Sequence, residues 1–160
     1  MKTPVIDIGV QSPLWNAEPA AEETVRKAIA AAAGLAPADG EVSVLLTDDG
    51  TIRGLNREWR GIDKPTNVLS FPSAQGPQAL LGDIAIAYET LVRECAAEHK
   101  PFLHHLSHLA VHGFLHLLGY DHQDDSQADA MEALERDILA RLDIADPYLL
   151  RERETETGNA

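Results

Sequence analysis

The chain has 160 residues, of which 44% are hydrophobic, and its formal net charge at pH 7 is −13. This length favours one domain with its own core, and the composition excludes a disordered chain. The negative charge on its own argues against non-specific binding of nucleic acid, because contacts with phosphates need cations. Cys95 is the only cysteine, so an intrachain disulfide and a cysteine-based zinc site are excluded. A reducing, cytosolic compartment fits best.

The hydrophobic pattern predicts alternating strands and helices in the first part of the chain. A helix is expected over 21–35, and another over 51–61 with Thr51 and Gly50 at its start. Glycine, proline and glutamine predict a loop over 73–80. Strands are expected over 4–10, 41–50 (ending in a turn), 64–72 and 81–89.

The second half of the chain is predicted to be mainly helical. Helices are expected over 89–100, 102–118 and 123–144, the last capped by Asp125 or Ser126. A single domain is expected over 1–150, followed by a charged, disordered tail over 151–160. Four strands mixed with about five helices indicate an α+β fold, in which helices cover a small four-stranded mixed sheet.

The helix over 102–118 is predicted to be central and buried, because it contains no Asp, Glu, Lys or Arg. A membrane span is the competing interpretation, and five histidines oppose it. His112 and His116 are four residues apart and project from one face, and a turn at Gly119 can return His122 to the same point. Three neutral imidazoles with an open fourth position are typical of a catalytic zinc site.

Two further features of this helix bear on the metal. Gly113 weakens the helix by about 1 kcal/mol relative to alanine, which predicts compensating close packing of the backbone near the metal. His108 either supports the site by a hydrogen bond or acid–base role, or is a core histidine. Structural roles are expected for the other three: His99, His104 and His105.

The spacing from His112 to His122 is that of the metzincin proteases, H-E-x-x-H-x-x-G-x-x-H. In those enzymes the glutamate after the first histidine is the general base. Gly113 occupies that position here. A peptidase of the usual mechanism would therefore lack its base.

Three segments together resemble one known family. "HGFLHLLGYDH" (112–122) resembles the YbeY signature H-G-x-L-H-L-x-G-Y-D-H. "NREWRGIDKPTNVLSFP" (56–72) resembles that family's arginine ahead of a K-P-T-[DN]-V-L-S-F-P run, and "LGDIAIA" (81–87) resembles its L-G-D-I strand.

The resemblance implies a zincin-like fold and a bacterial metal-dependent endoribonuclease. Such an enzyme would act on single-stranded RNA in ribosomal RNA processing, notably at the 3′ end of 16S rRNA, and in quality control of the small ribosomal subunit. It implies one zinc ion held by His112, His116 and His122, with Arg60 as the functional arginine. The implied partners are ribosomal RNA, the small subunit and its assembly factors in the cytoplasm, with no membrane and no DNA.

Basic residues gather in 53–64, either as a solvated helix face or as a local cationic patch. The guanidinium of Arg60 suits the scissile phosphate and would stabilise developing charge. Arg57 and Lys64 are expected to bind neighbouring phosphates of the RNA, whereas Arg53 is expected to lie too far around its helix.

The expected catalytic residues are Arg60, His112 and Asp121. Zinc would either lower the pKa of a water molecule towards about 7 or polarise a phosphoryl oxygen. The general base is unassigned, and Asp121 and His108 are the candidates. Asp121 could equally orient a zinc ligand or shape a turn. Asp83 either lines the cleft, as a supporting residue of the site, or caps the chain locally.

Two alternative functions remain at the level of sequence. One is a zinc peptidase or other hydrolase without the usual glutamate. The other is a non-catalytic, metal-binding ribosome-assembly factor. Nickel, copper or iron would also suit three imidazoles.

Overall fold

The computed structural model describes residues 3–73 and 80–148 of the chain. The predicted tail over 151–160 and most of the predicted loop over 73–80 lie outside these ranges. The helices are η1 (Pro13–Ala17, a 3-10 helix), α1 (Ala21–Leu35), α2 (Asp49–Arg60), α3 (Tyr88–Glu98), α4 (Phe102–Leu117) and α5 (Asp125–Arg141).

Four strands form one mixed sheet in the order β1-β2-β4-β3. β1 (Val5–Val10), β2 (Glu41–Thr47) and β4 (Leu80–Ala87) run parallel, and β3 (Val68–Pro72) pairs antiparallel with β4. The predicted α+β class and the four-stranded mixed sheet are confirmed. β1 and β3 form the two edges of this sheet.

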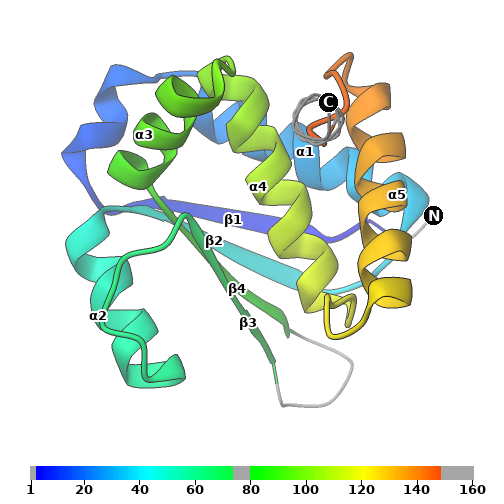
Figure 1. Cartoon of the computed structure of the whole chain (residues 1–160), viewed down its shortest axis with the longest axis horizontal. Helices are drawn as coiled ribbons and strands as arrows, with labels where there is room; N and C mark the ends of the chain where they lie inside the picture. Colours follow the sequence, from blue (N-terminus) through cyan, green and yellow to red (C-terminus); the bar gives the residue numbers. More distant parts are fainter. Residues whose placement is uncertain (1–2, 74–79, 149–160) are drawn as a thin grey trace, which may run out of the picture.

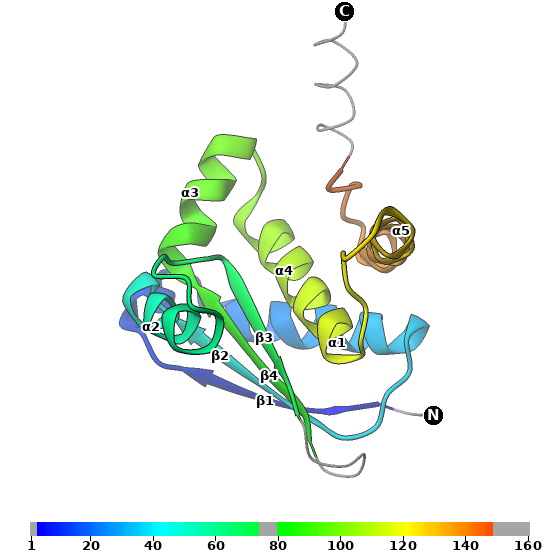
Figure 2. The same cartoon turned by 60° about the horizontal axis from the view of Figure 1, so that its bottom comes forward.

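The two faces of the sheet are covered unequally. Ile84 and Ile86 of β4 belong to the main core with α1 and α4, whereas the intervening Ala85 and Ala87 pack with Ile52 of α2. Because successive strand residues face opposite sides, α2 lies on the other face from α4. Figures 1 and 2 show α2 apart from α1, α4 and α5, at one end of the sheet. The rest of that face is left uncovered by any described helix.

α4 is the central helix, as predicted. It contacts α1, α3, α5 and the strands β3 and β4, and Leu106, Ala110 and Phe114 are fully buried. Figure 2 shows it between the sheet and α5. In the described ranges, no helix is both long and apolar enough to cross a membrane.

The predicted helix starts were wrong by a residue or two, for one reason. Asp48 caps α2, since its Oδ1 accepts the N–H of Thr51 at 2.8 Å, so Thr51 lies inside the helix and does not cap it with Gly50. Asp124 caps α5 in the same way, accepting the N–H of Gln127 at 2.8 Å. A capping carboxylate satisfies an N–H about three positions later, so the earlier aspartate of each run starts the helix.

The strand predicted over 64–72 is shorter than expected. It begins at Val68, because the residues before it are tied to α2. The side-chain amide of Asn56 donates to the carbonyl of Lys64 at 2.9 Å. That bond holds the chain against the end of α2 before the strand joins the sheet.

Candidate metal centre

The last two turns of α4 carry two of the three predicted ligands. The Nε2 atoms of His112 and His116 are 3.0 Å apart, and the two ring centroids are separated by 4.5 Å. Both side chains are half-buried. Their separation of four positions therefore places both rings on one side of the helix, as the sequence predicted.

The turn after α4 brings in the third histidine. Gly119 has a φ of 101°, in the left-handed region that favours glycine, and its N–H donates to the carbonyl of His116 at 3.1 Å. The N–H of Tyr120 donates to the carbonyl of Leu115, also at 3.1 Å, which completes a Schellman motif. The ring centroid of His122 then lies 5.0 and 5.2 Å from the other two rings. Gly119 occupies the position just past the helix end, as predicted.

The three rings fit a divalent metal ion. One nitrogen of each lies within 4.8 Å of the other two. Nitrogens bound tetrahedrally to zinc lie about 3.3 Å apart, close to the spacing of the two Nε2 atoms. Burial, followed by the nearby His112 and His122, lowers the pKa of His116 and favours the neutral, metal-binding form. Since His122 is exposed, one side of the cluster is open to solvent.

A buried carboxylate lies behind the first ligand, and the sequence analysis did not identify it. Glu135 of α5 is fully buried, and its Oε1 accepts from Nδ1 of His112 at 3.2 Å. A proton held on Nδ1 leaves Nε2 free to bind a metal. Burial alone raises the pKa of Glu135, but hydrogen bonds from His108 and His112 outweigh it and lower the pKa to about 2. The residue is therefore a carboxylate at neutral pH.

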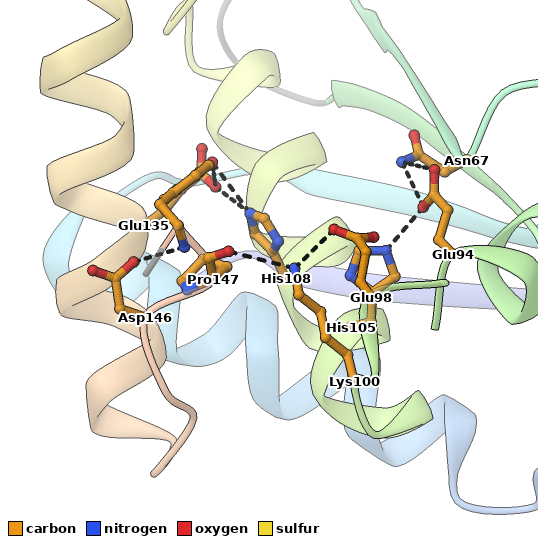
Figure 3. A network of polar contacts seen from close by, with 10 residues as sticks. Asn67, Glu94, Glu98, Lys100, His105, His108, Glu135, Asp146 and Pro147 are labelled. Atoms are coloured by element: carbon orange, nitrogen blue, oxygen red, sulfur yellow. Dashed lines mark hydrogen bonds and ion pairs between the residues drawn. The ribbon is translucent and has the colours of Figure 1, made fainter. Parts of the chain in front are cut away.

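The same carboxylate gathers two more groups through its Oε2. Nε2 of His108 lies 2.5 Å away, and the hydroxyl of Tyr148 donates to it at 2.8 Å. Figure 3 shows His108 pointing towards Glu135. His108 thus lies behind the histidine cluster and is joined to it through Glu135.

One sequence signal could have identified Glu135. α5 buries Met131, Ile138 and Leu139, and Glu135 falls four positions after Met131 on the same stripe. An acidic residue on a core-facing stripe needs a partner, because an unpaired buried charge is costly.

Gly113 is explained by packing against the sheet. A Cβ at this position would lie 3.0 Å from Cγ2 of Ile84 and 3.1 Å from Oγ of Ser70. The hydroxyl of Ser70 also donates to the Gly113 carbonyl at 3.0 Å. Close backbone packing was predicted, and its partners are β3 and β4. The space that the metzincin glutamate would need is filled by these strands.

Arg60 and Asp121 lie beside the cluster. A cavity of about 240 Å³ is lined by both of them together with His116, Ser70 and Tyr120, among others. Arg60 comes from the end of α2, so it reaches this cavity past the edge strand β3. Asp121 accepts the N–H of His122 through Oδ1 at 2.8 Å, which shapes the turn that carries the third ring.

The other basic residues of 53–64 do not line that cavity. Arg53 forms a two-point ion pair with Asp63, with Nε 2.8 Å from Oδ1, and Nη1 of Arg57 lies 3.9 Å from the same oxygen. Arg57 and Lys64 are exposed at the end of α2 and in the loop that follows. Of this run, Arg60 is the cation placed next to the histidines.

Asp83 lies on the uncovered face of the sheet. It is exposed, and it precedes Ile84, which faces α4. Its register partners are Ser43 on β2 and Phe71 on β3. It lines a groove on that face, and among the described contacts it forms none with the histidines.

The chain is similar to proteins of one known family. The family model described as "Endoribonuclease YbeY" matches residues 11–143. The chain belongs to the YbeY family. A protein named Endoribonuclease YbeY from Nitrobacter winogradskyi is 57% identical to this chain, over 96% of this chain and 86% of the relative. Another of that name, from a Bradyrhizobium species, is 55% identical over 94% of this chain and 95% of the relative. The solution structure of TM1509 from Thermotoga maritima is 26% identical, with a TM-score of 0.48, over 89% of this chain and 98% of that one.

The range that matches the YbeY family contains the three histidines, Arg60, Asp121 and Glu135. Tyr148, which also bonds to Glu135, lies beyond it.

Proposed function

We propose that this chain is a metal-dependent endoribonuclease that cleaves single-stranded RNA in ribosomal RNA processing. The observation that carries the proposal is the cavity lined by both Arg60 and His116, because a guanidinium beside the candidate metal ligands is suited to bind a phosphate there. Membership of a family whose members are named endoribonucleases supports the same reaction class.

Arg60 would hold the scissile phosphate. Its planar guanidinium offers two donors to two phosphate oxygens and stabilises negative charge as it develops. Within the described residues it forms no ion pair, whereas Arg53 is committed to Asp63. Arg57 and Lys64 would contact neighbouring phosphates of the RNA from their exposed positions.

His112, His116 and His122 would hold one zinc ion. When bound, zinc supplies Lewis-acid chemistry at the phosphoryl group and favours deprotonation of water. Glu135 would keep the proton of His112 on Nδ1, and so present Nε2 to the metal.

Asp121 is the better candidate for the general base. It lines the cavity with Arg60, and only its Oδ1 has a described hydrogen bond, which leaves Oδ2 to accept a proton. Nε2 of His108 is committed to the buried Glu135, behind His112. Asp121→Asn keeps an acceptor for the His122 N–H and loses the basicity, so it should slow cleavage and leave zinc content unchanged.

The test uses a labelled single-stranded RNA and a fluorogenic peptide panel with identically purified, zinc-loaded proteins. Arg60→Ala should lower the cleavage rate by about 100-fold or more, as loss of a charge-stabilising donor does. Arg141→Ala removes an exposed arginine from α5 and is the matched control. His116→Ala should lose zinc.

Two outcomes would overturn the proposal. Equal RNA cleavage by wild type and Arg60→Ala would point to a contaminating nuclease. Zinc-loaded wild type that binds the small ribosomal subunit without cleaving RNA would favour the non-catalytic assembly factor. Peptide cleavage is not expected, because the strands under Gly113 fill the place of the metzincin base.

The proposed substrate is the 3′ end of 16S rRNA, and the proposed wider role is quality control of the small subunit with its assembly factors. The motif resemblance supports both. A cytoplasmic location is proposed from the single cysteine, and neither membrane nor DNA is a proposed partner.

A further inference from the structure

The uncovered face of the sheet carries a groove that the chemistry at the histidines does not use. Its volume is about 810 Å³, and we call it the open-face groove. One row of its floor crosses all four strands in register, in the order Asp7, Ser43, Asp83 and Phe71.

An exposed aromatic side chain borders this groove. Trp59, in the last turn of α2, is 67% exposed, and its ring centroid lies 6.3 Å from that of Phe71. The ring of Trp59 is therefore accessible from the solvent side. Its free face offers a platform on which another flat ring can stack.

The polar groups of the groove accept hydrogen bonds and carry negative charge. Asp7 and Asp83 are exposed carboxylates, and Ser43 adds a hydroxyl between them. Arg60, at the rim, is the one cation among the described lining residues. Such a floor repels phosphate, whereas it suits a flat ring with N–H donors on its edge. An unpaired nucleobase has both properties.

The groove is continuous with the candidate metal centre. Arg60, Ser70 and Pro72 line both this groove and the cavity that contains His116. They belong to the edge strand β3 and the end of α2, so an extended chain can pass over this edge from one face of the sheet to the other. A phosphate held by Arg60 would therefore leave a neighbouring base within reach of Trp59.

We propose that the open-face groove is a nucleobase subsite, in which an unpaired base of the RNA stacks on Trp59 and donates hydrogen bonds to Asp83. The inference rests on the proposed function, since the RNA is its substrate. It adds a reason for single-strand specificity: a paired base has its Watson–Crick edge occupied and its faces stacked within the helix, so it cannot offer that edge to Asp83 or stack on Trp59.

Tryptophan fluorescence provides the test. The chain has two tryptophans, and Trp15 is only 3% exposed, so quenching by acrylamide reports on Trp59. A six-nucleotide single-stranded RNA should shield Trp59 in the zinc-loaded protein. An abasic ribose-phosphate oligomer of the same length and charge should not. Equal shielding by both oligomers would mean that the groove contacts the backbone, and would overturn the proposal.

Substitutions separate stacking from structure. Trp59→Ala should weaken RNA binding about 5- to 100-fold, the loss expected for one stacked base, and Trp59→Phe should restore most of it. Val92→Ala, at an exposed position on α3, is the matched control and should have no effect. Melting curves of each variant report whether the fold is kept. If Trp59→Ala unfolds, RNA binding by Trp59→Phe still tests the proposal.

Asp83→Asn decides between a base and a phosphate. If a base donates to the carboxylate, the variant should bind RNA more weakly, although it removes a negative charge. Tighter binding would mean that Asp83 merely repels RNA, and would refute its role.

RNA cleavage measured on the same samples keeps the two proposals apart. Cleavage by wild type with unaltered RNA binding by Trp59→Ala and Trp59→Phe would refute the subsite and leave the nuclease intact. Shielding of Trp59 without cleavage would support the subsite and refute the nuclease.

Discussion

Glu135→Gln tests whether the buried carboxylate behind His112 prepares the metal site. The carboxylate accepts from three donors, at 2.5 Å from His108, 3.2 Å from His112 and 2.8 Å from Tyr148. A glutamine of the same shape has one oxygen and one NH₂ group in their place. The NH₂ group donates, so it opposes at least one of these donors.

The substitution weakens the metal ligand His112 when the glutamine oxygen takes the place of Oε2 and keeps accepting from His108 and Tyr148. The NH₂ group then faces Nδ1 of His112, and the ring relieves the clash by moving its proton to Nε2, where the metal should bind. Loss of such a supporting partner lowers metal affinity about 10- to 100-fold. That is about 1.4 to 2.7 kcal/mol of binding free energy.

The assay is competition for zinc with a chromophoric chelator at neutral pH, together with thermal unfolding of the metal-free proteins. Asp137→Asn is the control, because it makes the same charge change at an exposed position of α5. Glu135→Ala should unfold more easily than Glu135→Gln, since it removes the carboxylate that accepts from His108 and Tyr148.

The reasoning is refuted if Glu135→Gln binds zinc as tightly as wild type and Asp137→Asn do. A metal-free Glu135→Gln protein that melts like wild type, yet binds zinc weakly, would separate positioning of the ligand from general stability.

Three further substitutions test the packing and electrostatics of the fold. Gly54→Ala, inside α2 with nothing within 4 Å of the new Cβ, should stabilise the protein by about 1 kcal/mol. Gly113→Ala makes the same change in α4, but its Cβ would lie 3.0 Å from the side chain of Ile84 in β4. We therefore expect the free energy of unfolding, measured in urea, to fall by about 1 kcal/mol. An equal gain in stability from both substitutions would contradict the packing argument. The carboxylate of Asp49 should stabilise the fold at neutral pH and lose this effect in acid. Burial raises the pKa of Asp49, but hydrogen bonds from Thr90 and Arg93 outweigh burial and lower the pKa below its usual value of 3.8. Asp49→Asn should therefore cost about 1 to 3 kcal/mol at pH 7, and this difference should fade as the pH falls below about 4, which urea unfolding at pH 7 and pH 3 would check.

The histidine cluster could be predicted because its geometry is local. His112 and His116 are related by one helical turn, and Gly119 permits the reversal that returns His122. These relations span eleven residues and depend on backbone geometry alone. The order of strands and helices was equally accessible, since it follows from the hydrophobic pattern.

The groups around the cluster were decided by tertiary packing. Glu135 is 23 positions from His112, and it meets that ring only because α5 packs on α4. The row from Asp7 to Phe71 exists only in the register of a sheet whose strand order, β1-β2-β4-β3, differs from the order along the chain. The sequence by itself determined which residues share a turn. The contacts between turns and strands depend on how the whole core closes, and no short-range pattern specifies that.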